Sequence, residues 1–253
     1  MPKLNRDGVE IYYEVHGEGP PFLMSHGYSA TSQMWRPQIE TITRTHSLIT
    51  WDMRGHGQSD YPEEQAEYSE AATVGDMVAL LDHLGHDEAV IGGLSLGGYM
   101  SLAFYLACPE RVKALVIFDT GPGYKNDQAR AAWNETSERT KQNYRENGLE
   151  ALKSRSTEMA SSVHRSAEGL IRAAEGMLKQ KDDRVIQSLP NIKVPTLIIV
   201  GSEDKPFHAA CNYMAAKIPG AKKIEIQGAG HAANIDQPER VNEALVDFLG
   251  RRG

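Results

Sequence analysis

Short apolar runs rich in β-branched residues recur along the chain, separated by longer segments with apolar residues at helical spacing. Runs of the first kind predict strands, and the longer segments predict helices. The predicted strands cover residues 9–15, 22–25, 47–51, 89–92, 114–118, 196–200 and 223–227, with a weaker first strand at 3–6. This alternation is typical of a mostly parallel sheet covered by helices on both faces. The pattern therefore predicts an eight-stranded α/β fold.

The last helix of the chain is clearly marked. Gln237-Pro238 gives a start signal, because proline is favoured in the first turn of a helix. Apolar residues then recur on one stripe, at Val241, Leu245, Phe248 and Leu249. A helix of this kind buries its apolar stripe against a neighbouring layer, so we expect it to pack on the sheet.

Between residues 122 and 190 the strand pattern disappears, and a charged, helix-favouring stretch takes its place. One apolar face stands out at i, i+1, i+4, i+7 and i+8, formed by Leu170, Ile171, Ala174, Met177 and Leu178. Ser166 lies where it could cap the start of that helix. The face has two interpretations: it packs on the core, as apolar stripes generally do, or part of it roofs a pocket.

Composition agrees with one globular unit. The chain has 253 residues, 40% of them hydrophobic, which suffices for a large core. Its formal net charge of -7 provides no basic surface for nucleic acid, so the expected partner is a small molecule. No apolar run approaches the ~18 residues of a membrane helix, and the polar N-terminus does not resemble a signal peptide. We therefore expect no membrane contact and a cytoplasmic location, and the oligomeric state has no signal in the sequence.

The most informative motif is Gly93-Leu94-Ser95-Leu96-Gly97, a G-x-S-x-G sequence between an apolar run and a helix-like stretch. A strand, a tight turn and a helix put the serine on a strained corner, where its hydroxyl projects to solvent. Glycine is required on both sides, because a Cβ atom there would collide where the strand and the helix approach. We interpret Ser95 as a nucleophile.

Two later turns supply partners for that serine. Asp204 follows the run at 196–200, and His231 follows the run at 223–227 after two glycines. An uncharged serine attacks poorly, so a histidine must take its proton, and a carboxylate must hold the imidazole in one tautomer. The predicted catalytic residues are Ser95, His231 and Asp204.

A third segment predicts an oxyanion site. The apolar run at 21–25 leads into His26-Gly27-Tyr28, after which the chain turns. Attack on a carbonyl turns its oxygen into an anion, and each backbone N–H aimed at that oxygen typically contributes a factor of about 10²–10³. We assign this role to the backbone N–H groups of Tyr28 and Leu96.

Together these motifs resemble the α/β-hydrolase superfamily over most of the chain. His26-Gly27-Tyr28 is similar to its oxyanion loop, Asp52 to Asp60 to its D-x-R-G-x-G-x-S loop, and the turn at Ser95 to its nucleophile elbow. The turns at Asp204 and His231 match its acid and histidine turns. The resemblance implies an α/β-hydrolase fold with a core domain at 1–121 and 191–253 and a small helical cap at 122–190, inserted after the sixth strand.

Within the superfamily the chain is most similar to small bacterial carboxylesterases and 3-oxoadipate enol-lactonases. This implies a serine hydrolase that cleaves a carboxylic ester or lactone through an acyl-enzyme, although the His-Gly-Tyr loop departs from the enol-lactonase pattern. A C–C bond hydrolase of the meta-cleavage type is one alternative, but such enzymes usually carry asparagine at the position of Leu94. A hydrolase-derived small-molecule receptor with slow turnover or none is the other alternative.

Other candidates for chemistry are weaker. Asp119 ends an earlier strand and is the alternative acid, but Asp204 is preferred because its Gly201-x-x-Asp204 turn matches the usual one more closely. His83 and His86 have the spacing of a metal pair on a helix, but no further ligand accompanies them. No glycine-rich phosphate loop precedes a helix either. We expect neither a metal nor a cofactor.

Four polar residues near the predicted site are expected to be structural. His26 should turn its loop through hydrogen bonds rather than act as a second base. Asp52, Arg54 and Asp60 should brace the loop that contains them.

Overall fold

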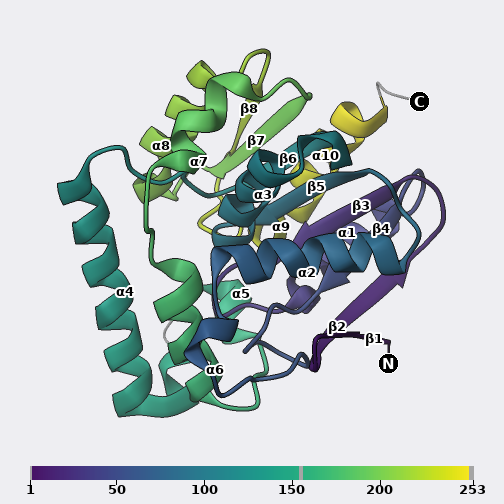
Figure 1. The fold of residues 1–253 in the computed structure, drawn as a ribbon. Coiled ribbons are helices and arrows are strands. Elements are labelled where there is room, and N and C mark those ends of the chain that lie inside the picture. Colours follow the sequence, from purple (N-terminus) through teal and green to yellow (C-terminus); the bar gives the residue numbers. More distant parts are fainter. Residues whose placement is uncertain (1, 154–155, 251–253) are drawn as a thin grey trace.

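The fold is built on one eight-stranded sheet (Figure 1). The computed structural model describes residues 2–153 and 156–250. The strands are β1 (Lys3–Arg6), β2 (Val9–His16), β3 (Pro21–Ser25), β4 (Ser47–Trp51), β5 (Ala89–Leu94), β6 (Val112–Phe118), β7 (Thr196–Gly201) and β8 (Lys222–Ile226). Their order in the sheet is β1-β2-β4-β3-β5-β6-β7-β8. Strand β2 is antiparallel to both its neighbours and all other pairs are parallel, so the predicted mostly parallel sheet is confirmed.

Alternation of side chains along the strands creates two apolar layers. On one face Leu23 lies in register with Ile49 and Ile91, and on the other face Phe22 lies in register with Leu48 and Val90. Successive residues of a strand point to opposite faces, so a run that is apolar at every position must be covered on both sides. All of these side chains are buried.

Helices cover both faces, as predicted. One layer contains α2 (Glu70–His83), α3 (Leu96–Ala107) and α8 (Lys205–Lys217), and the other contains α1 (Arg36–Ile42), α9 (Ala233–Asp236) and α10 (Pro238–Gly250). Short turns of helix connect them at η1 (Ser32–Trp35), η2 (Gln65–Glu67), η3 (Pro109–Arg111) and η6 (Leu189–Asn191). The apolar stripe predicted for the last helix is buried, at Val241, Leu245, Phe248 and Leu249. Across residues 2–153 and 156–250, no helix combines the length and apolar character that crossing a bilayer requires.

Between β6 and β7 the chain leaves the sheet and forms a group of inserted helices. They are α4 (Asp127–Asn147), η4 (Gly148–Leu152), α5 (Thr157–Ala160), α6 (Ala167–Ala173), the π-helical η5 (Ala174–Leu178) and α7 (Arg184–Ser188). Figure 1 shows α4 standing beside α6 at one side of the sheet. A hydrogen bond joins α4 to η5, which directly follows α6, since the Ser137 hydroxyl donates to the carbonyl of Ala174 at 2.8 Å.

Helix α6, which contributes to the predicted apolar face, lacks the side-chain cap expected from Ser166. Ser166 occupies the N-cap position of α6 with extended dihedral angles, but its side chain accepts no capping hydrogen bond. The predicted Ser166 cap is therefore wrong in its chemistry, although its place is correct. The face itself is buried at Leu170, Ile171, Ala174 and Met177.

Candidate active site

Ser95 lies on a strained turn between β5 and α3. Its backbone has φ 53° and ψ -114°, a left-handed conformation that a non-glycine residue adopts only under constraint. A Cβ atom at Gly97 would come within 2.3 Å of the Ser25 carbonyl oxygen, and one at Gly93 would come within 2.4 Å of the Gly97 carbonyl carbon. These approaches explain the glycines of the motif and fix the serine at the carboxyl end of the sheet.

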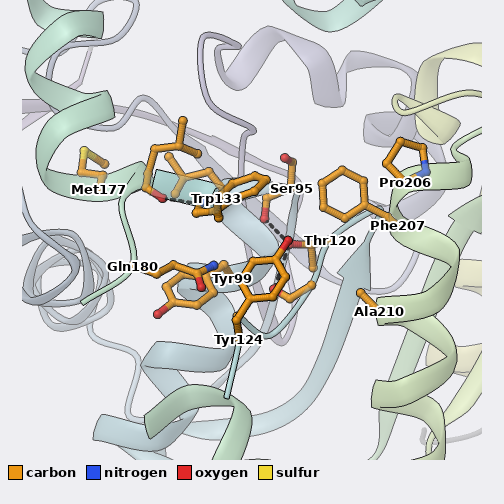
Figure 2. Close-up of a pocket in the computed structure, with 14 residues that line it drawn as sticks. Ser95, Tyr99, Thr120, Tyr124, Trp133, Met177, Gln180, Pro206, Phe207 and Ala210 are labelled. Atoms are coloured by element: carbon orange, nitrogen blue, oxygen red, sulfur yellow. Dashed lines mark hydrogen bonds between the residues drawn. The ribbon is translucent and has the colours of Figure 1, made fainter. Parts of the chain in front are cut away.

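Hydrogen bonds hold the backbone of this turn. The N–H of Ser95 donates to the Phe118 carbonyl at 3.0 Å, and the Thr120 hydroxyl donates to the Ser95 carbonyl at 2.6 Å (Figure 2). The Ser95 hydroxyl lines a cavity and makes no hydrogen bond with the described residues. It is thus open to a reacting group.

His231 and Asp204 form a hydrogen-bonded pair. The Nδ1 atom of His231 lies 2.8 Å from Oδ2 of Asp204, whose side chain is 6% exposed. The ring of Phe207 stacks on His231 with centroids 5.0 Å apart and planes at 28°. An imidazole that donates from Nδ1 to a carboxylate presents an unprotonated Nε2, the form that accepts a proton.

Asp119, the alternative acid, takes a different place. It is fully buried, and its Oδ1 atom accepts a hydrogen bond from the Gly201 N–H at 2.7 Å, while Oδ2 has no partner among the described residues. Burial and the neighbouring Asp204 carboxylate raise the pKa of Asp119 well above its usual range. The structure joins His231 to Asp204 and not to Asp119.

The segment proposed to bind the oxyanion passes against the serine turn. A Cβ atom on Gly27 would lie 3.6 Å from the Cβ atom of Ser95, so this loop and the turn touch. Tyr28 follows directly, and Leu96 is the first residue of α3. The structure therefore brings the two predicted N–H donors to the same end of the sheet as Ser95.

The four residues expected to be structural all make hydrogen bonds that hold loops near the site. His26 donates from Nδ1 to the Gly27 carbonyl at 2.7 Å, and its Nε2 accepts from the Met53 N–H at 2.9 Å. Asp52 accepts from the N–H of Gln58 in its own loop and from the N–H of Ser32 in η1, and Asp60 accepts from the Glu10 N–H at 2.9 Å. Arg54 makes a bidentate pair with the buried Asp76 at 2.7 and 2.8 Å. Away from the site, His83 shares a hydrogen bond with the Tyr13 hydroxyl at 3.1 Å.

Three buried histidines lie beside the site. The ring centroids of His26 and His56 are 4.9 Å apart, and those of His56 and His164 are 5.7 Å apart. Each ring uses one nitrogen to accept a backbone N–H and the other to donate to a backbone carbonyl. Burial lowers the pKa of all three, to about 4 for His164. All three imidazoles are therefore neutral near pH 7.

We expect the free energy of unfolding to fall as the pH is lowered from about 6.5 towards 4. Below the unfolded pKa, each of these histidines binds a proton in the unfolded chain that the folded chain takes up only at lower pH. Each therefore contributes a slope of up to about 1.4 kcal/mol per pH unit. Asp119 acts in the opposite sense because its pKa is raised. The measurement is urea unfolding of wild type and His164→Gln between pH 4.5 and 7.5. The difference between the two proteins isolates the contribution of His164 to the pH dependence of stability.

The His164→Gln protein should have a shallower pH dependence by about one bound proton. His86→Gln is the matched control, because His86 lies on the half-exposed connection after α2. Equal slopes for wild type and His164→Gln would contradict a buried, neutral His164.

The cavity beside Ser95 has a volume of about 190 Å³. It lies between the sheet and the inserted helices, and Figure 2 shows Ser95 with Phe207 on one side and Trp133 and Met177 on the other. Its walls are Ser95, Leu96, Tyr99, Thr120, Gly121, Gly123, Tyr124, Trp133, Met177, Leu178, Gln180, Pro206, Phe207 and Ala210. None of these described residues carries a charge.

The cavity accounts for both interpretations of the apolar face in the insertion. Leu170, Ile171 and Ala174 pack on the core, whereas Met177 and Leu178 line the cavity. Sequence reasoning missed Trp133 and Gln180 as lining residues, because a single tryptophan or glutamine in a charged helical stretch does not reveal which way it faces. Phe207 had a usable signal, since it lies three residues after the acid at the start of a helix.

Comparisons with known proteins agree with this geometry. A family model described as alpha/beta hydrolase fold matches residues 20–181. A putative carbamate hydrolase RutD from Azorhizobium caulinodans is 27% identical over 99% of this chain and 98% of that protein. A 3-oxoadipate enol-lactonase from Acinetobacter baylyi is 25% identical over 98% and 96%. The solved structure of a thermophilic esterase from Thermogutta terrifontis is 27% identical, with 99% of both chains covered and a TM-score of 0.82.

Proposed function

The chain belongs to the α/β-hydrolase family, and we propose that it is a serine hydrolase that cleaves an uncharged carboxylic ester or lactone. The resemblance to bacterial esterases and enol-lactonases is confirmed by the relatives found. The observation that carries the proposal is the 2.8 Å pair of His231 and Asp204 at the same sheet edge as the strained Ser95 turn. This arrangement suits acyl transfer to serine.

In the proposed reaction, Nε2 of His231 takes the proton of the Ser95 hydroxyl, and the serine oxygen attacks the carbonyl carbon. The backbone N–H groups of Tyr28 and Leu96 donate hydrogen bonds to the resulting oxyanion. His231 then protonates the leaving alcohol, and an acyl-enzyme remains on Ser95. A water deprotonated by His231 attacks that ester and releases the acid. Asp204 stabilises the imidazolium in both steps.

The cavity suggests the character of the substrate. Its walls are mostly aromatic and aliphatic, so they favour an apolar acyl or alcohol group. Among the polar wall residues, Gln180 has a buried Oε1 atom with no partner among the described residues. An unpaired amide oxygen of this kind suits a substrate with one neutral hydrogen-bond donor. The inserted helices that contribute Trp133 and Met177 fit the proposed cap at 122–190, over a core domain at 1–121 and 191–253.

The test of the proposal is hydrolysis of p-nitrophenyl esters from acetate to decanoate. We expect many turnovers per enzyme, with the rate highest for an acyl chain that fills the 190 Å³ cavity and lower for longer chains. A single burst of product without steady turnover would favour the receptor alternative. Cleavage of a vinylogous diketone without ester hydrolysis would favour the C–C hydrolase.

The same assay tests the charge of the substrate. For acyl chains of equal length, we expect a terminal carboxylate to lower kcat/KM by about 100-fold or more, because the cavity offers no cation to replace the lost hydration of that group. The matched control is the corresponding terminal methyl ester, which has nearly the same size without the charge. Equal kcat/KM for the acid and the methyl ester would contradict an uncharged substrate.

A further inference from the structure

The residue after Tyr28 is held by an unusual number of hydrogen bonds. The Ser29 N–H donates to Nε2 of His56 at 3.2 Å, and the Ser29 carbonyl accepts from Nε2 of His164 at 3.0 Å. Its hydroxyl oxygen accepts from the Tyr144 hydroxyl at 2.8 Å. All four side chains are buried. Every polar group of Ser29 is thus fixed by a defined partner.

Two of these partners come from the inserted helices. Tyr144 lies near the end of α4, and His164 lies between α5 and α6. His164 also accepts the Gly57 N–H at Nδ1, at 3.1 Å, so its ring bridges two loops at the end of the sheet. In addition, the Tyr28 hydroxyl donates to the Leu170 carbonyl of α6 at 2.8 Å. The insertion therefore contacts both Tyr28 and Ser29.

The backbone at Ser29 requires such support. Its φ is 61°, in the left-handed region where a residue other than glycine costs about 1 kcal/mol or more. A conformation of this kind persists only where its surroundings determine it. The Tyr28 carbonyl and the Ser29 N–H share one peptide plane, and the Tyr28 N–H belongs to the plane before it. Fixing Ser29 therefore restrains the Tyr28 N–H through the two dihedral angles of Tyr28, whose own hydroxyl is held by the Leu170 carbonyl.

We propose that Tyr144 and His164 are positioning residues through which the inserted helices hold the oxyanion-binding backbone of Tyr28 in place. The inference rests on the proposed function, since it assigns a purpose to that backbone. An oxyanion donor acts only when it is aimed in advance at the developing charge. The helices that form the cavity roof would then also set the rate of the chemical step.

The test compares Tyr144→Phe with Ser137→Ala. Both changes remove one buried hydroxyl from α4, but the Ser137 hydroxyl bonds the Ala174 carbonyl and does not touch Ser29. We expect Tyr144→Phe to lower kcat about tenfold with KM changed less than twofold, because the oxyanion contact is made in the transition state. A boronic acid that adds to Ser95 should bind about tenfold more weakly. Ser137→Ala should leave both values unchanged.

Two results would overturn the inference. One is a kcat for Tyr144→Phe equal to that of Ser137→Ala. The other is additive losses in Tyr144→Phe and Ser29→Ala combined, since a shared hydrogen bond can be lost only once. For His164, Gln is expected to retain more kcat than Ala, because its amide N–H can still donate to the Ser29 carbonyl.

Amide hydrogen exchange separates this inference from the proposed function. If the wild-type protein hydrolyses neither esters nor lactones, the proposed function fails, and exchange at residues 26–30 still decides whether the insertion holds the loop. Tyr144→Phe should speed exchange there and Ser137→Ala should not. Equal exchange in the two variants would overturn the positioning role whatever the activity.

Discussion

Replacing Ser95 by alanine is expected to lower kcat for p-nitrophenyl esters by about 10⁴-fold or more. The hydroxyl is the proposed nucleophile, so no acyl-enzyme can form without it. Residual catalysis would come from the oxyanion site and substrate binding alone. The measurement is steady-state hydrolysis by both proteins, together with mass spectrometry of the intact chain after a short reaction. The wild type should gain the mass of the acyl group and Ser95→Ala should not.

The matched control for this change is Ser101→Ala. Ser101 lies in α3, the helix that follows the Ser95 turn, is buried, and donates to the Gly97 carbonyl at 2.8 Å. Losing that hydrogen bond should lower the free energy of unfolding by about 1 kcal/mol while kcat stays within about threefold of wild type. Full turnover in Ser95→Ala would show that the chemistry does not pass through this serine.

Asp204→Asn is expected to have the second largest effect, a fall in kcat of about 10⁴-fold. The asparagine amide can donate to Nδ1 of His231, which would move the ring proton to Nε2 and remove the base. A neutral side chain also cannot stabilise the imidazolium. KM should change little, because neither Asp204 nor His231 lines the described cavity. The measurement is kcat and KM across pH 6 to 9.

Asp119→Asn is the comparison that shows which of the two carboxylates, Asp119 or Asp204, serves as the partner of His231. The raised pKa of Asp119 favours the neutral carboxyl, and an asparagine oxygen can still accept the Gly201 N–H, so kcat should stay within about fivefold of wild type. If Asp119→Asn loses as much activity as Asp204→Asn, then the Asp119 carboxyl also takes part in supporting His231.

Much of the fold could be predicted because the strands are apolar on both faces. Runs such as the one at 196–200 leave little choice between strand and helix when they are short and β-branched. The end positions of the strands were less predictable. Strand β5 continues through Gly92 and Gly93 to Leu94, because these glycines stay paired with β6. Glycine is a poor strand former by itself, and only the neighbouring strand decides its state.

The site was predictable where it follows strands and unpredictable where it depends on the inserted helices. Parallel strands end at one edge, so the turns after them place Ser95, Asp204 and His231 at that edge, where His231 and Asp204 pair. The direction in which Trp133 or Tyr144 points is set by how α4 packs. The buried face of this helix includes Ser137 and Lys141, and polar residues of this kind do not indicate burial in the sequence. The Ser166 cap failed for a related reason: a serine at the right position need not turn its hydroxyl towards the helix.

Left-handed backbone conformations occur at Ser29, Ser95 and Asp119, all at the carboxyl edge of the sheet. Glycine would adopt each of them more readily, so substitution there relieves strain while it removes a functional side chain or a hydrogen bond. Selection for heat resistance alone, without selection for turnover, should therefore enrich glycine at these positions. If the three side chains persist in natural sequences, selection for activity must outweigh the stability that glycine would add at these positions.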